Sequence, residues 1–142
     1  FWVQALVRRS LLMEGARIFA MTSSGSRSTW PSYGAVSAAK AALESHVRQL
    51  AVELGPQQIT VNAIMAGVCD TPALAVIPGA EVLKASALAN HPRGRLTQPE
   101  DVAACLVELA RPGTAWMTGN VIGVDGGEAI CGGGLGSTDL SG

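Results

Sequence analysis

The stretch SAAKAALESHVRQLAVELGPQQITVNAIMAG (residues 37–67) places a long helical pattern directly before a buried strand pattern. A helix is expected over residues 32–54, because past its first turn this segment carries neither glycine nor proline. Gly55 and Pro56 then end it. Residues 59–67 are mostly apolar and rich in β-branched side chains, which is typical of a strand covered on both faces. A helix that leads into such a strand favours a parallel α/β sheet.

The segments on either side extend the same pattern. Residues 1–13 carry apolar side chains at helical spacing, and residues 16–24 form a short apolar run that predicts a second buried strand. Residues 98–110 predict a helix with proline near its first position, and residues 120–125 predict a third strand. Strands that alternate with helices require right-handed crossovers onto one sheet. We therefore predict the fold class α/β, with a doubly wound parallel sheet.

Two segments do not fit this alternation. Residues 69–95 contain three prolines, and we expect one short helical stretch among them. The tail, residues 131–142, is rich in glycine but has no helix after it, as a phosphate-binding loop would need. We interpret it as a flexible tail and expect residues 1–130 to form one domain.

Composition and charge exclude several classes of function. The chain has 142 residues, of which 48% are apolar and 15% charged, so it can bury one core. A net charge of −1 provides no basic surface for nucleic acid or an anionic membrane, and no apolar run is long enough to span a bilayer. The three cysteines form no C-x-x-C pair, which predicts free thiols in a reducing compartment and no metal site. We expect a cytoplasmic protein that binds neither nucleic acid nor membrane.

Tyr33 is the only tyrosine of the chain, and it stands seven residues before Lys40. Seven residues are close to two helical turns, so both side chains leave one face of the helix, about 10 Å apart along its axis. A phenol beside an ammonium group can donate a proton to an oxyanion, which suits carbonyl or enoyl reduction. The spacing alone leaves a second interpretation open, in which Tyr33 only packs its ring at the helix start and Lys40 is solvated.

Four segments in order resemble the short-chain dehydrogenase/reductase family. AAKAALESHVRQLAVEL (38–54) is similar to its catalytic helix, and ITVNAIMAGVCDT (59–71) to its strand and cofactor loop, V-N-x-(I/V)-x-P-G-x-x-x-T. PRGRLTQPEDVA (92–103) and MTGNVIGVDGG (117–127) resemble two later segments. The resemblance covers roughly residues 1–130 and implies the C-terminal catalytic part of a Rossmann-like reductase domain.

The seven-residue spacing points to one branch of that family. Ordinary members place their tyrosine four residues before the lysine, where this chain has Val36, which cannot donate a proton. Y-x6-K is the spacing of the enoyl-acyl carrier protein reductases. Ser23, seventeen residues before Lys40, stands where ordinary members carry a catalytic serine and many enoyl reductases carry a second tyrosine. Serine here, with tyrosine at the shifted place, is most similar to enoyl reductase III.

The resemblance implies a reaction and the residues that carry it. The expected reaction reduces trans-2-enoyl thioesters on acyl carrier protein with NADH or NADPH, in fatty acid biosynthesis. The family also forms homodimers or homotetramers. It implies catalytic roles for Tyr33, Lys40 and Ser23, cofactor contacts from Lys40, Gly67, Val68 and Thr71, and substrate-lining roles for Leu74 and Ile77.

Some of these positions also have plain structural interpretations. Leu74 and Ile77 could simply pack their helix onto the core, and Gly67, which follows Ala66 where the family has proline, could be an ordinary turn glycine. His91 lies in a loop, and the sequence assigns it no role.

The family's adenine-binding half, with its T-G-x-x-x-G-x-G turn, has no counterpart here. We therefore expect a partial Rossmann-like sheet that lacks the N-terminal dinucleotide-binding half and leaves a strand edge unpaired, and we expect this chain alone to be inactive. Two other functions stay open. One is a short-chain reductase of ketones or alcohols with a different proton donor. The other is a non-catalytic fragment that acts as a binding or assembly module.

Overall fold

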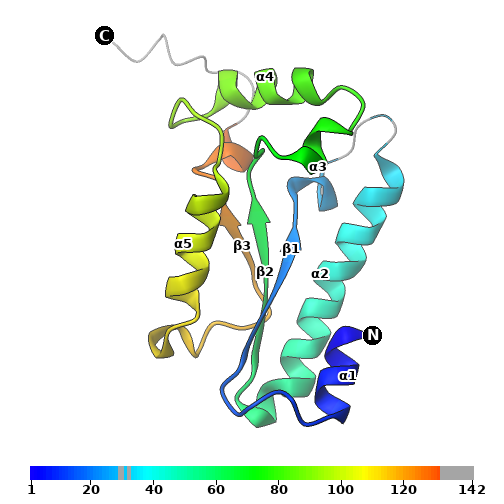
Figure 1. Ribbon diagram of the computed structural model, residues 1–142, viewed down its shortest axis with the longest axis vertical. Coiled ribbons are helices and arrows are strands. Elements are labelled where there is room, and N and C mark those ends of the chain that lie inside the picture. The colour runs from blue at the N-terminus through cyan, green and yellow to red at the C-terminus, as the bar shows by residue number, and fades with distance from the viewer. Residues whose placement is uncertain (29–30, 32, 132–142) are drawn as a thin grey trace.

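Three parallel strands form the centre of the molecule (Figure 1). The computed structural model describes residues 1–131 other than 29, 30 and 32, so the expected flexible tail lies almost wholly outside the described residues. The strands lie in the order β1-β2-β3, with bounds β1 Arg17–Thr22, β2 Thr60–Ala66 and β3 Val121–Val124. The predicted fold class and all three predicted strands are confirmed.

The strand register brings two loops together at the carboxyl end of the sheet. Thr22, the last residue of β1, is paired with Met65 of β2, which is itself paired with Gly123 of β3. The loops that follow β1 and β2 therefore start side by side. Among the described strands, β1 pairs only with β2, so its other edge is left open in this part of the chain.

Helix α2 (Gly34–Leu54) packs along the sheet and forms the main core with β2. Val47, Ala51 and Leu54 on one face of the helix meet Ile59, Val61 and Ala63. Removing these apolar side chains from water is what holds the helix against the sheet. The helix starts two residues later than the predicted range of 32–54 and ends where predicted. No helix in the described part of the chain is long and apolar enough to cross a membrane.

Helix α1 (Trp2–Arg8) is shorter than the helical pattern of residues 1–13 predicts. It ends in a Schellman motif, in which Leu11 N–H donates to Leu6 O (2.9 Å) and Ser10 N–H donates to Val7 O (3.0 Å). Ser10 takes the left-handed conformation that this motif needs, with φ of 53°. Glycine usually occupies that position, so no stop signal is visible in the sequence here.

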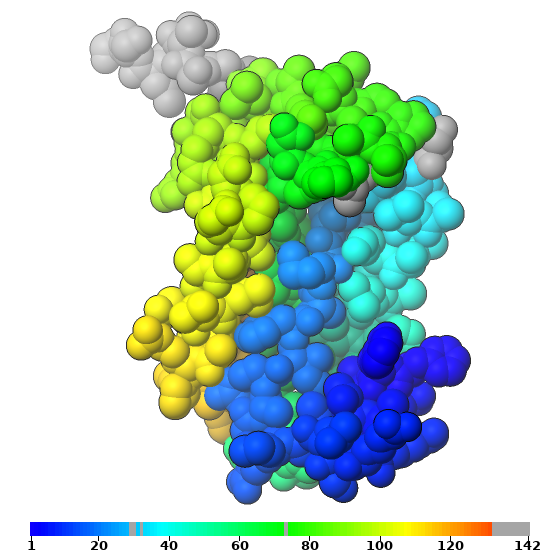
Figure 2. Space-filling model, viewed as in Figure 1, coloured from blue at the N-terminus to red at the C-terminus, as the bar shows by residue number. Residues whose placement is uncertain are grey.

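Residues 69–95 contain two helices, whereas the sequence predicted one. They are α3 (Pro72–Ala75) and α4 (Ala80–Asn90), separated by a turn in which Gly79 has φ of 82°. Figure 1 shows both helices beyond the arrowheads of the strands, and Figure 2 shows this segment as an overhang at that end of the molecule. This segment therefore covers the carboxyl end of the sheet, where the loops after β1 and β2 begin.

Helix α5 (Pro99–Leu109) matches the predicted helix, with Pro99 at its first position. Its start is fixed by a capping box, since the Asp101 carboxylate accepts from Gln98 N–H (2.9 Å) and the Gln98 side chain caps in return. The helix runs beside β3.

Buried Asn62 in β2 fastens the chain just before β3. Its Nδ2 donates to Met117 O (2.8 Å), and its Oδ1 accepts from Asn120 N–H and Asn120 Nδ2, both at 3.1 Å. These bonds join two segments that are far apart in the sequence. They give the asparagine of the V-N-x-(I/V) pattern a structural role.

Replacing Asn62 with alanine is expected to lower the free energy of unfolding by about 2 to 3 kcal/mol, because partners of its amide would be buried without a hydrogen bond. Denaturant unfolding would measure the change. Asn90→Ala is the matched control: Asn90 is exposed and makes only a local bond to Ser86 O (2.9 Å). Equal effects of the two changes would contradict this role of Asn62.

Candidate active site

The candidate residues gather at the carboxyl ends of β1 and β2. Ser23 follows β1 directly, and Gly67 and Val68 follow β2. Because the two strands are paired, the chain leaves the sheet at neighbouring points. Ligands of open parallel sheets bind in the crevice outside the carboxyl ends of the strands.

Lys40 is fixed against the end of β1. Its Nζ donates to Met21 O at 3.0 Å, and the residue is half-buried. One turn further along α2, the Glu44 carboxylate accepts from Thr22 Oγ1 at 2.9 Å, and Glu44 is only 7% exposed. The two bonds set the rotation of α2 against β1. Glu44 was not among the predicted residues, although a glutamate one turn after Lys40 is visible in the sequence.

Tyr33 lies at the start of α2, two helical turns before Lys40. It occupies the N-cap position, and its backbone carbonyl accepts from Ser37 N–H (2.9 Å), so it belongs to the first turn of the helix. The residue is half-buried. Val36, at the place where ordinary family members carry tyrosine, is exposed and offers no group that can ionise or donate. The phenol of Tyr33 is therefore the one tyrosine hydroxyl that this helix can present.

The Ser23 hydroxyl has an unusual environment. Its Oγ is buried and has no hydrogen-bond partner among the described residues. Buried hydroxyl groups normally have a partner, so an unpaired one next to a crevice favours a partner from a bound molecule. The Ser23 hydroxyl is therefore available to a bound molecule at the carboxyl end of β1.

Gly67 lies where three segments converge. A Cβ at this position would fall against Thr97 Oγ1, 2.7 Å from Glu128 Oε2 and 3.1 Å from Asp125 Cβ. Its N–H continues the sheet by donating to Val124 O (3.3 Å). No side chain fits here, so the packing of the chain around this turn itself requires glycine.

The other predicted positions follow along this loop and the helices above it. Val68 N–H donates to Glu128 Oε2 at 2.9 Å. Thr71 caps α3 by accepting from Leu74 N–H (3.3 Å), which leaves its hydroxyl hydrogen to donate elsewhere. Leu74 is buried and Ile77 half-buried, so both lie toward the body of the protein.

Two valines of the same segment face solvent. Val76 and Val82 are 82% and 75% exposed. If this segment lines a path for an acyl chain, only the other apolar residues can contribute to it.

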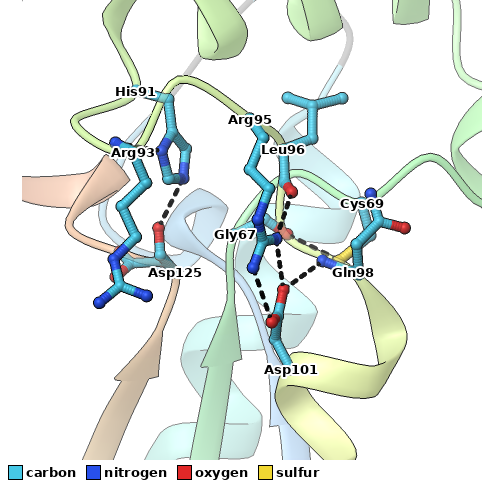
Figure 3. Close-up of polar contacts among 9 residues, drawn as sticks. All are labelled: Gly67, Cys69, His91, Arg93, Arg95, Leu96, Gln98, Asp101 and Asp125. Atoms are coloured by element: carbon cyan, nitrogen blue, oxygen red, sulfur yellow. Dashed lines mark hydrogen bonds and ion pairs between the residues drawn. The ribbon is translucent and has the colours of Figure 1, made fainter.

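A cavity of about 460 Å³ lies beside the carboxyl end of β3 (Figure 3). Neither Tyr33 nor Lys40 lines it. His91, to which the sequence assigned no role, is buried at its rim. Its Nε2 lies 3.0 Å from Asp125 O, and its Nδ1 accepts from Arg93 N–H (3.1 Å), which makes Nε2 the donor. His91 therefore joins the loop before α5 to the turn after β3.

Arg95 and Asp101 form a two-bond ion pair in the same cavity wall, with N–O distances of 2.6 and 2.8 Å (Figure 3). The hydrogen bond from the Arg95 guanidinium is the largest cause that holds the pKa of the Asp101 carboxyl well below its usual range. The hydrogen bond from the Gln98 backbone N–H lowers this pKa further. This pairing holds the Arg95 side chain beside the start of α5.

These residues fit the nicotinamide end of a dinucleotide. Lys40 offers donors beside the end of β1, and Ser23 offers an unpaired hydroxyl. Nothing in the described chain resembles the glycine-rich turn that holds the pyrophosphate. The arrangement is that of an α/β nucleotide-binding fold, with candidate polar groups at the carboxyl ends of its parallel strands.

The enoyl-(acyl carrier protein) reductase family model matches residues 1–128, and the chain belongs to this family of short-chain reductases. The resemblance drawn from the sequence motifs is thus confirmed.

Relatives of differing activity share this part of the fold. The 1-cyclohexenylcarbonyl-CoA reductase of Streptomyces collinus is 34% identical over 84% of the chain, and 44% of its own length is covered. The 3-oxoacyl-[acyl-carrier-protein] reductase of Pseudomonas aeruginosa is 42% identical over 63% of the chain and 36% of its own length. The crystal structure of the enoyl-[acyl-carrier-protein] reductase (NADH) of Aquifex aeolicus superimposes with a TM-score of 0.83 and 33% identity. That match covers 92% of this chain and 52% of the other. The chain thus spans about half the length, or less, of these proteins.

Proposed function

We propose that the protein carrying this chain reduces the carbon–carbon double bond of trans-2-enoyl thioesters on acyl carrier protein, with NADH or NADPH as hydride donor. The observation that carries this proposal is the placement of Tyr33 at the start of α2, two turns before Lys40, with exposed Val36 at the alternative position. The family match over residues 1–128 supports it. We further propose a cytoplasmic homodimer or homotetramer, with residues 1–130 as the catalytic part of one domain.

In this mechanism the chain's residues stabilise the negative charge that develops on the substrate. When bound, the reduced dinucleotide would supply the hydride that the β-carbon of the thioester accepts. The electron pair of the double bond then moves toward the thioester oxygen, where the Tyr33 hydroxyl donates a hydrogen bond or its proton. A proton taken up from solvent at the α-carbon completes the saturated thioester, and any proton that Tyr33 gave to the thioester oxygen returns to Tyr33. Lys40 keeps the local potential positive and donates to the cofactor's ribose hydroxyls, and Ser23 Oγ orients the reacting groups.

Gly67, Val68 and Thr71 would provide the cofactor contacts in this scheme, and Leu74 and Ile77 the apolar lining for the acyl chain. The support for these roles is position. All five residues lie in the loop after β2 or in α3 and the turn that follows it, beyond the carboxyl end of the sheet. An apolar lining with few polar groups suits an acyl chain.

A second candidate function is the reduction of a 3-oxoacyl thioester. It is favoured by the 42% identity to the 3-oxoacyl-[acyl-carrier-protein] reductase, which exceeds the 34% identity to the 1-cyclohexenylcarbonyl-CoA reductase. The match to the 3-oxoacyl reductase covers less of this chain. It requires a proton donor other than a tyrosine at position 36, since Val36 stands there.

A substrate comparison on the full-length gene product distinguishes the two functions. We expect NADH or NADPH oxidation with a crotonyl thioester and at least about 100-fold lower kcat/KM with an acetoacetyl thioester, because the proton donor is placed for an enolate oxygen. Both dinucleotides are tested with each substrate. Preferential turnover of the acetoacetyl thioester would instead establish a ketone reductase.

A further inference from the structure

Glu128 reaches across from the turn after β3 to the loop that follows β2. Its Oε2 accepts the hydrogen bond from Val68 N–H at 2.9 Å, although the two residues are 60 positions apart in the sequence. Gly67 N–H makes the last bond to β3, so Val68 is the first residue whose N–H lies beyond the sheet. A carboxylate acceptor makes this bond stronger than one between neutral groups.

The turn that carries Glu128 is itself held firmly. The Asp125 carboxylate accepts from Gly127 N–H and from Ala129 N–H, both at 3.0 Å. Glu128 N–H donates to Asp125 O, also at 3.0 Å. Glu128 is half-buried. These hydrogen bonds fix the backbone of the turn, and so they fix the point from which the Glu128 carboxylate extends.

The same carboxylate bounds the loop at two further points. It lies 2.7 Å from where a Cβ of Gly67 would be, so it closes one side of the space around that glycine. The charge of Glu128 also acts on the Cys69 thiol, next along the loop. Burial is the largest cause that raises the pKa of Cys69, and the Glu128 and Asp101 carboxylates raise it further. Cys69 Sγ lies 3.4 Å from Gly67 O, within the same loop (Figure 3).

We propose that Glu128 is a positioning residue, which holds the loop of residues 67–70 in the conformation that contacts the nicotinamide cofactor. The claim that this loop contacts the cofactor rests on the proposed function. The claim that Glu128 holds the loop rests on the contacts of Glu128 described above. Loss of the carboxylate would free Val68 N–H and let the loop leave the end of β2. Dinucleotide binding would then have to restore the order of the loop, and affinity would fall.

The test compares Glu128→Ala and Glu128→Gln in the full-length protein with Glu108→Ala as control. Glu108 is an exposed residue of α5 that pairs only with Arg111 at 2.8 Å. We expect Glu128→Ala to weaken binding of NADH or NADPH, whichever the protein uses, about tenfold, the effect of losing one hydrogen bond to a charged group. Glu128→Gln keeps an oxygen acceptor and should remain within about threefold of the control.

Cys69 provides a second readout that does not need activity. Its alkylation by iodoacetamide can be followed in the tryptic peptide 49–84, which contains no other cysteine. Both variants should raise the rate near pH 8, because removing the charge of Glu128 favours the thiolate. Only Glu128→Ala should also raise the limiting rate at high pH, where the thiol is already ionised and the rate reports exposure of the loop.

Three results decide the inference. If the high-pH rate or the dinucleotide affinity of Glu128→Ala equals that of Glu108→Ala, the proposal is overturned. Wild-type protein that binds neither dinucleotide would contradict the proposed function, while the alkylation comparison would still show whether Glu128 holds the loop. Should circular dichroism show that Glu128→Ala does not fold, Glu128→Asp takes its place. It keeps the charge but is too short to reach Val68 N–H, and the same outcomes apply.

Discussion

Replacing Tyr33 with phenylalanine is expected to lower kcat for enoyl thioester reduction about 100- to 1,000-fold, the range for loss of a positioned proton donor. The change removes one oxygen atom and leaves the ring, the start of α2 and the position of Lys40 as they are. KM for the thioester and the dissociation constant of the dinucleotide should therefore change little. Steady-state kinetics of the full-length protein with a crotonyl thioester would measure the effect.

A double variant tests whether the position of the donor matters. Tyr33→Phe combined with Val36→Tyr returns the hydroxyl to the helix, but four residues before Lys40 instead of seven. We expect enoyl reduction to stay low, because the donor is displaced by almost one helical turn from where the enolate oxygen forms. Retention of more than about one tenth of wild-type kcat by Tyr33→Phe alone would mean that the proton comes from another group.

Replacing Gly67 with alanine is expected to cost about 1 to 3 kcal/mol of folding stability and most of the dinucleotide affinity, because the added methyl group overfills a closed space. Two of its three nearest neighbours cannot swing aside. Thr97 is a short buried side chain, and Asp125 is tied down through its own carboxylate. The third, Glu128, could move only by releasing Val68 N–H.

Gly123→Ala is the matched control for this change. Gly123 lies on β3, paired with Met65, and a Cβ there would meet nothing closer than 3.7 Å. Thermal unfolding and dinucleotide titration of both variants would separate crowding from the general effect of adding a methyl group. If the two alanine variants behave alike, Gly67 is not the point of close approach that the structure describes.

Local sequence patterns were enough to predict the sheet and its two main helices. The β-branched run of residues 59–67 and the uninterrupted run before it each follow one period, and the observed β2 and α2 agree with them within two residues at each end. Helix α1 was predicted too long because its end depends on Ser10 taking a left-handed conformation that serine rarely adopts. The division between α3 and α4 depends on a turn at Gly79, within a segment where three prolines obscure the helical period.

For the candidate site, sequence motifs selected residues but could not describe how they are held. The lysine, the loop glycine and the shifted tyrosine were found because a family pattern fixes their spacing. Glu128 and His91 were missed because their partners, Val68 and Asp125, are 60 and 34 residues away, and no local pattern encodes such a contact. The roles of Ser23, Thr71 and the substrate-lining residues stay predictions, and that of Tyr33 is the one that the experiments above address.

The bonds between Asn62 and Asn120 also bear on how the protein is made. They join positions 58 residues apart, and every strand pair of this sheet is parallel, so each requires a long crossover before it can form. On the ribosome, β2 leaves the exit tunnel well before β3 has been translated. During that interval the strand edge of β2 that pairs with β3 has no partner, which is a state exposed to aggregation. Synthesis that pauses between these strands should therefore increase the dependence of the nascent chain on chaperones.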